Sequence, residues 1–161
     1  MKELLIRPEL CLGCRSCELA CAVEHSRGKT LLSAIRENPL PQYRVHVVTD
    51  GRGFLPLQCR NCEDAPCLTA CLTGALHRDA RGVVTCTTEL CVGCWMCIMV
   101  CPFGIITQKH EERRISKCDR CPDREEPACV NACPVGALIY AEIDDQARLQ
   151  RQQVLAGLRT L

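Results

Sequence analysis

The cysteines of this 161-residue chain constrain its fold more than any other feature, because sixteen of the seventeen fall into four runs of four. Every run opens with the spacing C-x2-C and closes with C-x3-C. Runs one and three have the full spacing C-x2-C-x2-C-x3-C, whereas runs two and four lengthen only the gap before the third cysteine. The runs are Cys11, Cys14, Cys17, Cys21; Cys59, Cys62, Cys67, Cys71; Cys91, Cys94, Cys97, Cys101; and Cys118, Cys121, Cys129, Cys133.

This spacing is typical of ferredoxins that bind [4Fe–4S] cubanes. A cubane has four iron corners, and each of them needs one thiolate. A short loop can bring three cysteines to three corners, whereas the C-x3-C step carries the fourth cysteine away along a helical turn. In two-cluster ferredoxins that fourth cysteine therefore ligates the neighbouring cluster. We expect four [4Fe–4S] clusters whose runs associate in pairs, and the spacing alone leaves open which runs pair.

Disulfides and zinc are the competing uses of so many cysteines. An odd count leaves one cysteine without a disulfide partner, and the opening MKELLI leads into the first run without the apolar segment of a secretory signal. Zinc sites are built from two C-x2-C pairs or from such pairs with histidines, and they do not need a cysteine triplet followed by C-x3-C. The pattern therefore favours iron–sulfur clusters over both alternatives.

Composition agrees with this interpretation, because the chain has only two Phe, two Tyr and one Trp to fill a core. The clusters would then supply the missing bulk, and we expect the cluster-free chain to be unfolded or molten. The formal charge is +1, but four oxidised clusters with their thiolates would bring it to roughly −7. Basic residues form no block or stripe, so nucleic-acid binding is not expected.

The segments between the runs predict an α+β fold of short elements. The first and last strands are expected to pair, and the other six to form three hairpins. A short helix is expected between residues 22 and 38, before Asn38-Pro39. The predicted strands are 3–6, 43–48, 54–57, 75–78, 83–86, 104–107, 114–117 and 137–140.

The runs also form an internal repeat, since Gly74, Gly104 and Gly136 each follow the fourth cysteine of a run by three residues. Glycine there lets the backbone leave the helical turn with positive φ. Run one lacks this glycine, and a long insertion, residues 22–58, begins at that point. We expect one cluster-binding domain over residues 1–142.

A helical tail is expected over residues 143–161. Its apolar residues lie among Gln and Arg, and they could pack on the domain or on a partner subunit. These apolar residues are Ile143, Ala147, Val154, Leu155 and Leu158.

With these motifs, residues 3–142 resemble the four-cluster iron–sulfur electron-transfer subunits that accompany molybdenum and tungsten oxidoreductases, formate-linked hydrogenases and carbon monoxide dehydrogenase. The opening segment 11–26, CLGCRSCELACAVEHS, is similar to the compact CooF-type subunits associated with carbon monoxide dehydrogenase. The resemblance implies two bacterial-type dicluster ferredoxin-like modules, one with runs one and four and the other with runs two and three.

The resemblance also implies which cysteines share a cluster. In the terminal pair, one cluster would be bound by Cys11, Cys14, Cys17 and Cys133, and its neighbour by Cys118, Cys121, Cys129 and Cys21. In the central pair, one cluster would be bound by Cys59, Cys62, Cys67 and Cys101, and its neighbour by Cys91, Cys94, Cys97 and Cys71. Pairing of run one with run two is the alternative that the spacing does not exclude.

The sequence contains no phosphate-binding glycine loop, dinucleotide fingerprint or Ser/His/Asp arrangement. We therefore expect a non-catalytic subunit that carries single electrons between a redox enzyme, with carbon monoxide dehydrogenase favoured, and an acceptor such as a hydrogenase or a flavin-dependent NAD(P) oxidoreductase. The alternative is an electron-transfer subunit of a formate dehydrogenase or of another molybdenum or tungsten oxidoreductase. An iron–sulfur redox sensor and a catalytic iron–sulfur enzyme are further alternatives.

No apolar run approaches the ~18 residues of a membrane span, and a cytoplasmic complex is expected.

Several residues outside the ligand pattern have structural and functional interpretations. Cys86 is expected to be a small core residue, and Trp95 to pack against a cluster. Arg15, Arg60 and Lys117 flank cluster cysteines, where they either raise reduction potentials or are simply solvated. The histidines show no paired ligand spacing; they are His25, His46, His77 and His110.

Overall fold

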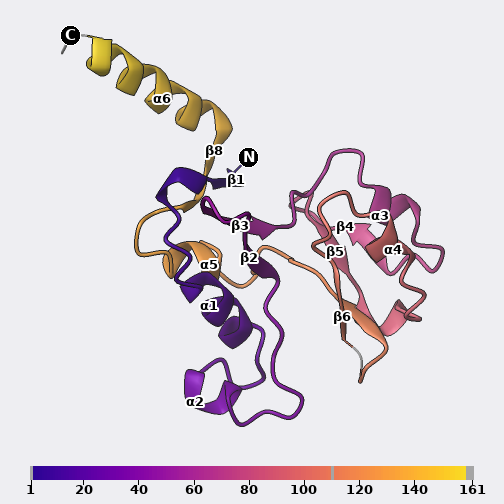
Figure 1. Cartoon of the computed structure of the whole chain (residues 1–161). Helices are drawn as coiled ribbons and strands as arrows, with labels where there is room; N and C mark the ends of the chain where they lie inside the picture. Colours follow the sequence, from indigo (N-terminus) through magenta and orange to yellow (C-terminus); the bar gives the residue numbers. More distant parts are fainter. Residues whose placement is uncertain (1, 110, 159–161) are drawn as a thin grey trace.

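The computed structural model describes residues 2–109 and 111–158, and it consists of two lobes and a projecting C-terminal helix (Figure 1). The terminal module comprises residues 2–58 and 118–142, so it contains both cysteine runs one and four. The central module comprises residues 59–117 and contains runs two and three. Each module has its own hydrophobic core, and cysteines take part in both cores.

The terminal module is built on the pairing of the two ends of the cluster-binding region. Strands β1 and β8 are antiparallel, with Leu4 opposite Tyr140, and the buried Leu4 and Leu138 face the core. Helices α1 and α5 pack side by side, and the β2–β3 hairpin packs against α1 through Val45 and Val47. The elements are β1 (Lys2–Ile6), η1 (Pro8–Leu10), α1 (Ser16–Glu24), α2 (Leu31–Ala34), β2 (Val45–Thr49), β3 (Phe54–Gln58), α5 (Ala128–Asn131) and β8 (Leu138–Glu142).

The insertion, residues 22–58, belongs to the terminal module. The short helix expected there is α2, which begins at a capping box formed by Thr30 and Ser33. The hairpin β2–β3 follows it, as the alternating apolar residues predicted. The ring of Phe54, at the start of β3, lies against Gly13, where a Cβ would approach the ring to 2.7 Å. The insertion therefore supports the loop of the first cysteine run.

The central module contains two short hairpins and two single-turn helices. Its core gathers apolar residues from both hairpins, among them Leu76, Val84 and Ile115. The two predicted hairpins are present, each with three residue pairs. The elements are α3 (Pro66–Thr69), β4 (Leu76–Arg78), β5 (Val84–Cys86), η2 (Thr88–Leu90), α4 (Met96–Met99), β6 (Thr107–Lys109) and β7 (Arg114–Ser116).

The strand predicted at 104–107 begins only at Thr107, so that prediction was wrong for its first three residues. Gly104 has a φ of 58° and turns the chain out of the preceding helical turn. Ile105 and Ile106 then point into the core, where both are 3% exposed. Their apolar character reflects burial in the core before the strand begins.

The tail forms helix α6 (Ile143–Leu158), which extends away from the terminal module in Figure 1. The helix packs on β8, and Gln146 near its start is buried. Farther along the helix, Val154 and Leu155 are 63% and 58% exposed. The Leu158 side chain and residues 159–161 of the predicted tail lie outside the described part of the chain. Among the described helices, none combines the length and apolar character needed to cross a membrane.

Candidate iron–sulfur centres

All four cysteine runs share one backbone feature. The residue just before the second cysteine has a left-handed φ in each run: 69° at Gly13, 49° at Asn61, 66° at Gly93 and 58° at Arg120. This conformation closes a tight loop around the space that the first cysteines face. Glycine and asparagine adopt it readily, whereas arginine adopts it less often.

The Arg120 side chain is buried, and its guanidinium forms a bidentate ion pair with Glu3 of β1. Planar pairing of this kind fixes the orientation of the guanidinium. The strand that opens the chain therefore holds the fourth cysteine run in its left-handed conformation.

The C-x3-C step of each run follows a helical turn, as the spacing predicted. The third cysteine lies within the helix, and the fourth lies about one turn later: Cys17 and Cys21 in α1, Cys67 in α3, Cys97 in α4 and Cys129 in α5. In runs two to four, the expected glycine follows with a φ of 58–67°. The fourth cysteine is thereby displaced from the first three of its own run.

The fold then joins the fourth cysteine to three cysteines of another run. Three separate cavities each have four of the cysteines in their walls. The first is lined by Cys11, Cys14, Cys17 and Cys133. The second is lined by Cys59, Cys62, Cys67 and Cys101. The third is lined by Cys91, Cys94, Cys97 and Cys71.

The remaining four cysteines also lie together. Burial raises the pKa of Cys21 to about 12, and the negative charges of Cys118 and Cys121 from run four add to this. Burial likewise raises the pKa of Cys129, and the negative charges of Cys118, Cys21 and Cys121 raise it further. Cys21 of run one therefore lies with the first three cysteines of run four.

The donor chemistry fits an iron–sulfur cluster in every group. Each group supplies four cysteines, which is the number of thiolates that a [4Fe–4S] cluster needs, and requires no other residue type to complete the set. Burial raises the pKa of Cys17, Cys97 and Cys118 to about 11, so these thiols are protonated at neutral pH without a cluster. Cluster binding must therefore release protons.

Backbone amides point at the fourth cysteine of three runs. The amide of Arg44 donates to Cys21 Sγ over 3.2 Å, and the amide of Ala137 donates to Cys133 Sγ over 3.2 Å. In the central module the amide of Leu76 donates to Cys71 Sγ over 3.5 Å. Hydrogen bonds to ligand sulfur stabilise negative charge and raise the potential of an iron–sulfur cluster.

The four groups form a series. Cys17 and Cys21 join the first two groups, because they lie one turn apart on α1. Burial raises the pKa of Cys118, and the charge of Cys59 adds to it, so the second group adjoins the third across the module boundary. The groups at the two ends of the series each have one exposed cysteine, Cys14 in the terminal module and Cys94 in the central module.

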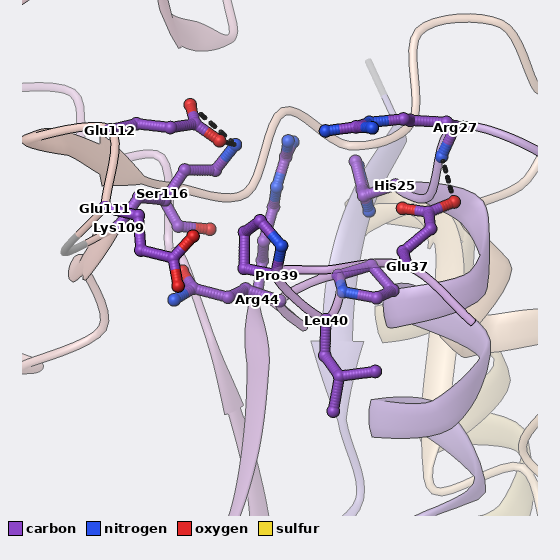
Figure 2. Close-up of a pocket in the computed structure, with 12 residues that line it drawn as sticks. His25, Arg27, Glu37, Pro39, Leu40, Arg44, Lys109, Glu111, Glu112 and Ser116 are labelled. Carbon is purple, nitrogen blue, oxygen red and sulfur yellow. Dashed lines mark hydrogen bonds and ion pairs between the residues drawn. The ribbon is translucent and has the colours of Figure 1, made fainter. Parts of the chain in front are cut away.

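A larger polar cavity, of about 340 Å³, lies between the insertion and the β6–β7 hairpin (Figure 2). No cysteine lines it. Glu37 accepts a hydrogen bond from the amide of Arg27, and Lys109 pairs with Glu112. Three basic and three acidic side chains line the cavity, so its walls favour neither an anion nor a cation.

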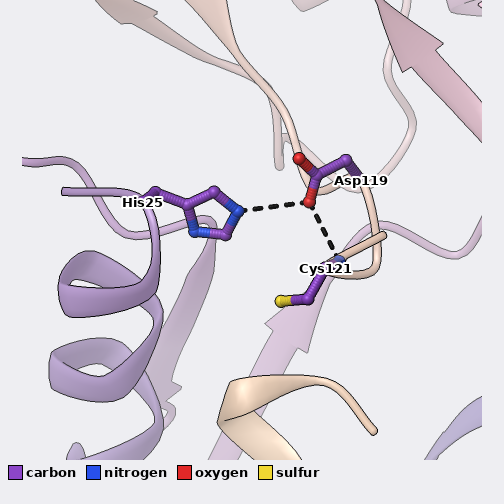
Figure 3. Close-up of side chains that lie close together, drawn as sticks. All are labelled: His25, Asp119 and Cys121. Atoms are coloured by element: carbon purple, nitrogen blue, oxygen red, sulfur yellow. Dashed lines mark hydrogen bonds and ion pairs between the residues drawn. The ribbon is translucent and has the colours of Figure 1, made fainter. Parts of the chain in front are cut away.

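His25 contacts the second cysteine group, although its sequence position showed no paired ligand spacing. It lies four residues after Cys21, and its Nδ1 is 2.7 Å from the Cys21 carbonyl oxygen. Its Nε2 lies 3.2 Å from Asp119 Oδ1, which also accepts a hydrogen bond from the amide of Cys121 (Figure 3). The i, i+4 spacing from Cys21, with His25 as the residue that caps the C-terminus of α1, was the signal for this contact.

Asp119 links the insertion to the fourth run. Burial opposes its ionisation, but the hydrogen bond from His25 and the charge of Arg44 outweigh burial and hold the pKa of this carboxyl well below its usual range. Arg44 also pairs with Asp119 through its guanidinium. The carboxylate is therefore satisfied by side chains around the cysteine group.

The other residues of interest have structural positions. Cys86 joins the central core, and burial raises its pKa to about 11, with the charges of Cys91, Cys71 and Cys97 adding to this. Trp95 also packs against that core. His46 stacks edge-on with Tyr43, His77 contacts Thr85, and His110 lies outside the described residues.

Comparison with known proteins identifies the family. The family described as "4Fe-4S dicluster domain" matches residues 52–143, and a "4Fe-4S binding domain" matches residues 8–24. An "Iron-sulfur protein" of Rhodospirillum rubrum is 46% identical over 85% of this chain and 80% of its own length. "Electron transport protein HydN" of Escherichia coli is 35% identical over 89% of each chain. "Thiosulfate reductase electron transfer subunit PhsB" of Salmonella typhi is 32% identical over 88% of this chain and 75% of its own.

The chain belongs to the 4Fe-4S dicluster family. Together with its seventeen cysteines, the two matched regions show that it carries four [4Fe–4S] clusters. This confirms the cofactor predicted from the cysteine spacing.

Proposed function

We propose that the protein is an electron-transfer subunit, which carries single electrons between a redox enzyme and a second redox partner. When bound, each [4Fe–4S] cluster supplies a reversible one-electron couple. The observation that carries the proposal is the series of four cysteine groups, which ends in one exposed cysteine at each end, Cys14 and Cys94. Such a series gives two separate partners access to its opposite ends.

All sixteen cysteines act as ligands in this proposal, in the nested arrangement. Run four supplies Cys133 to the first three cysteines of run one, and run one supplies Cys21 in return. Run three supplies Cys101 to run two, and run two supplies Cys71 to run three. The three four-cysteine cavities support these sets, as does the proximity of Cys21 to Cys118 and Cys121.

The protein itself would hold the clusters apart, exclude water and adjust their potentials. Burial of Cys17, Cys21, Cys97, Cys121 and Cys129 keeps water from the inner side of the sites. Four cysteines for each cluster leave no iron corner free for a substrate, so we further propose that the subunit performs no substrate chemistry. The relatives named as electron-transfer proteins support this role.

We favour carbon monoxide dehydrogenase as the enzyme partner, in a cytoplasmic complex, with a hydrogenase or a flavin-dependent NAD(P) oxidoreductase as the acceptor. The support is the segment 11–26, which is similar to CooF-type subunits. Service to a molybdenum or tungsten oxidoreductase is the second candidate. It is favoured by the likeness to PhsB and to a relative from Haemophilus influenzae that is named as part of an anaerobic dimethyl sulfoxide reductase and is 34% identical over 85% of the present sequence.

Iron and sulfide analysis of anaerobically purified protein, combined with EPR during a reductive titration, tests the proposal. We expect about sixteen irons and sixteen sulfides per chain and spin-coupled signals from low-potential clusters. Purification of the complex from native cells, followed by reduction of the clusters by each candidate enzyme with its substrate, identifies the donor. Stoichiometric zinc without sulfide, or substrate turnover by the isolated subunit, would overturn the proposal.

A further inference from the structure

Lys117 is a buried cation at the boundary between the two modules. It follows β7 directly and precedes Cys118, and its side chain is only 5% exposed. Its Nζ donates hydrogen bonds to the carbonyl oxygen of Val84 in β5 and, over 3.2 Å, to that of Cys118. Two carbonyl groups from different segments therefore fix the position of this ammonium group.

A buried ammonium group is costly unless negative charge lies near it. Among the residues that the structure describes, no carboxylate lies within 4 Å of Lys117 Nζ. Asp79 and Asp119 line the same neighbouring cavity, but each is paired with an arginine, Arg81 and Arg44 respectively. The cysteine groups are therefore the available source of compensating negative charge.

Two of these groups flank Lys117. It lines the cavity of Cys59, Cys62, Cys67 and Cys101. Burial raises the pKa of Cys67, and the charge of Lys117 opposes that rise. On its other side, Lys117 adjoins Cys118 in sequence and bonds to its carbonyl group. The ammonium group thus lies between the second and third members of the cysteine series.

We propose that Lys117 raises the reduction potentials of the two inner clusters, those of the Cys59 group and the Cys118 group. Reduction adds one negative charge to a cluster, and a fixed positive charge nearby stabilises the reduced form. Burial preserves this effect, because solvent and salt screen an interior charge far less than a surface charge. The lysine therefore favours passage of an electron across the module boundary. The inference rests on the electron-transfer function proposed above.

The test is an EPR-monitored redox titration of the holoprotein with Lys117→Met and Lys117→Arg. In Lys117→Met we expect two of the four midpoint potentials to fall. Each fall should be ~59 mV, which is a tenfold change in the reduction equilibrium of a one-electron couple. The other two should stay at the wild-type values. Lys117→Arg keeps the charge and should restore all four.

Arg60→Gln is the matched control. Arg60 lines the same cavity and adjoins Cys59, but it is exposed, so removal of its charge should shift no midpoint as far as Lys117→Met does. If Lys117→Met loses iron, Lys117→Gln serves instead, because it keeps a donor for the Val84 carbonyl without the charge.

The outcomes separate the two proposals. Unchanged midpoints in a neutral Lys117 variant with sixteen irons would overturn the role of Lys117 and leave electron transfer intact. A midpoint shift in Arg60→Gln as large as that in Lys117→Met would also overturn the role of Lys117. Loss of clusters in both Lys117→Met and Lys117→Gln, but not in Lys117→Arg, would overturn it too. A wild-type chain without reducible clusters would instead overturn the proposed function.

Discussion

The terminal and central modules solve the same packing problem with different amounts of protein. Four of the five buried cysteines belong to the terminal module, and only Cys97 belongs to the central one. The terminal module adds a nine-residue helix, a five-residue strand pair and the insertion around its cysteines. The central module has only three-residue strand pairs and single-turn helices. The central module therefore has the smaller framework of helices and strand pairs around its clusters.

The modules also differ in the surface around their exposed cysteines. Residues 65–76 and 90–107 of the central module contain no charged side chain. Leu72 and Met99 there are 93% and 79% exposed. Around Cys14, in contrast, Arg15 and Glu18 form an ion pair. Glu18 is buried, so the exposed surface beside Cys14 combines the charge of Arg15 with the apolar Leu12, whereas the surface at the other end of the series is apolar and uncharged.

Removal of the clusters should have the largest effect and should separate the modules. Anaerobic iron chelation is expected to unfold the central module completely, whereas the terminal module keeps part of its helix and strand pairing in a molten form. Hydrogen exchange followed by mass spectrometry would measure this difference peptide by peptide. Equal loss of protection in both modules would show that the protein framework of the terminal module contributes nothing on its own.

Substitution of a fourth cysteine should have the next largest effect. Cys101→Ser is expected to lose the cluster of the Cys59 group and to keep the cluster bound by the rest of its own run. Iron analysis should then fall from about sixteen to about twelve per chain. Cys133→Ser is the matched variant in the terminal module. The clusters that remain in Cys133→Ser should survive longer in air than those that remain in Cys101→Ser. Loss of a cluster from run one in Cys101→Ser would contradict the nested arrangement.

Asp119→Asn should weaken the terminal module alone, because Asp119 connects Arg44 and His25 to the fourth run. We expect a loss of about 1–3 kcal/mol in the free energy of unfolding. The pKa of Asp119 is lowered in the folded chain, so its contribution is present above the ordinary carboxyl pKa and disappears as pH falls below about 4. Denaturant unfolding of the holoprotein between pH 3 and 7 measures this, and the difference between wild type and variant should shrink toward acid. A difference that is constant with pH would contradict the assignment.

Cys86→Ala should have the smallest effect. Cys86 packs in the central core beside Cys71 and Cys91, but four other cysteines already surround that cavity. We expect sixteen irons, unchanged EPR signals and a loss of about 1 kcal/mol from the smaller side chain. Loss of four irons would show that Cys86 is a ligand, and the central module would then differ from the terminal one in ligation as well as in packing.

Local sequence signals predicted much of the fold. The three hairpins and the short helix of the insertion were readable because turn residues and apolar alternation act over a few neighbours. The positive φ at Gly74, Gly104 and Gly136 was readable from the repeat. The strand at 104–107 was misplaced because Ile105 and Ile106 have the same apolar signature in a core loop as in a strand.

Contacts between distant segments were not readable in this way. Nothing near Lys117 in the sequence shows that it is buried while Arg60 is exposed, since both simply precede or follow a cysteine. The approach of His25 to Asp119 joins residues 94 positions apart. The sequence also could not show that Val154 and Leu155 are exposed, because their amphipathic pattern suits packing on the same chain or on a partner.

By itself, the sequence determined the cofactor and its number, because three cysteines at short spacing are the local requirement of each [4Fe–4S] cluster and the sequence has four such runs. It also determined the helical turn that displaces each fourth cysteine. Only the tertiary structure decided which cysteines meet and in what order the four groups follow one another, since the pairing of β1 with β8 and the packing of α1 on α5 bring runs one and four together. It also decided that Lys117 lies buried at the boundary, because burial depends on the packing of both modules.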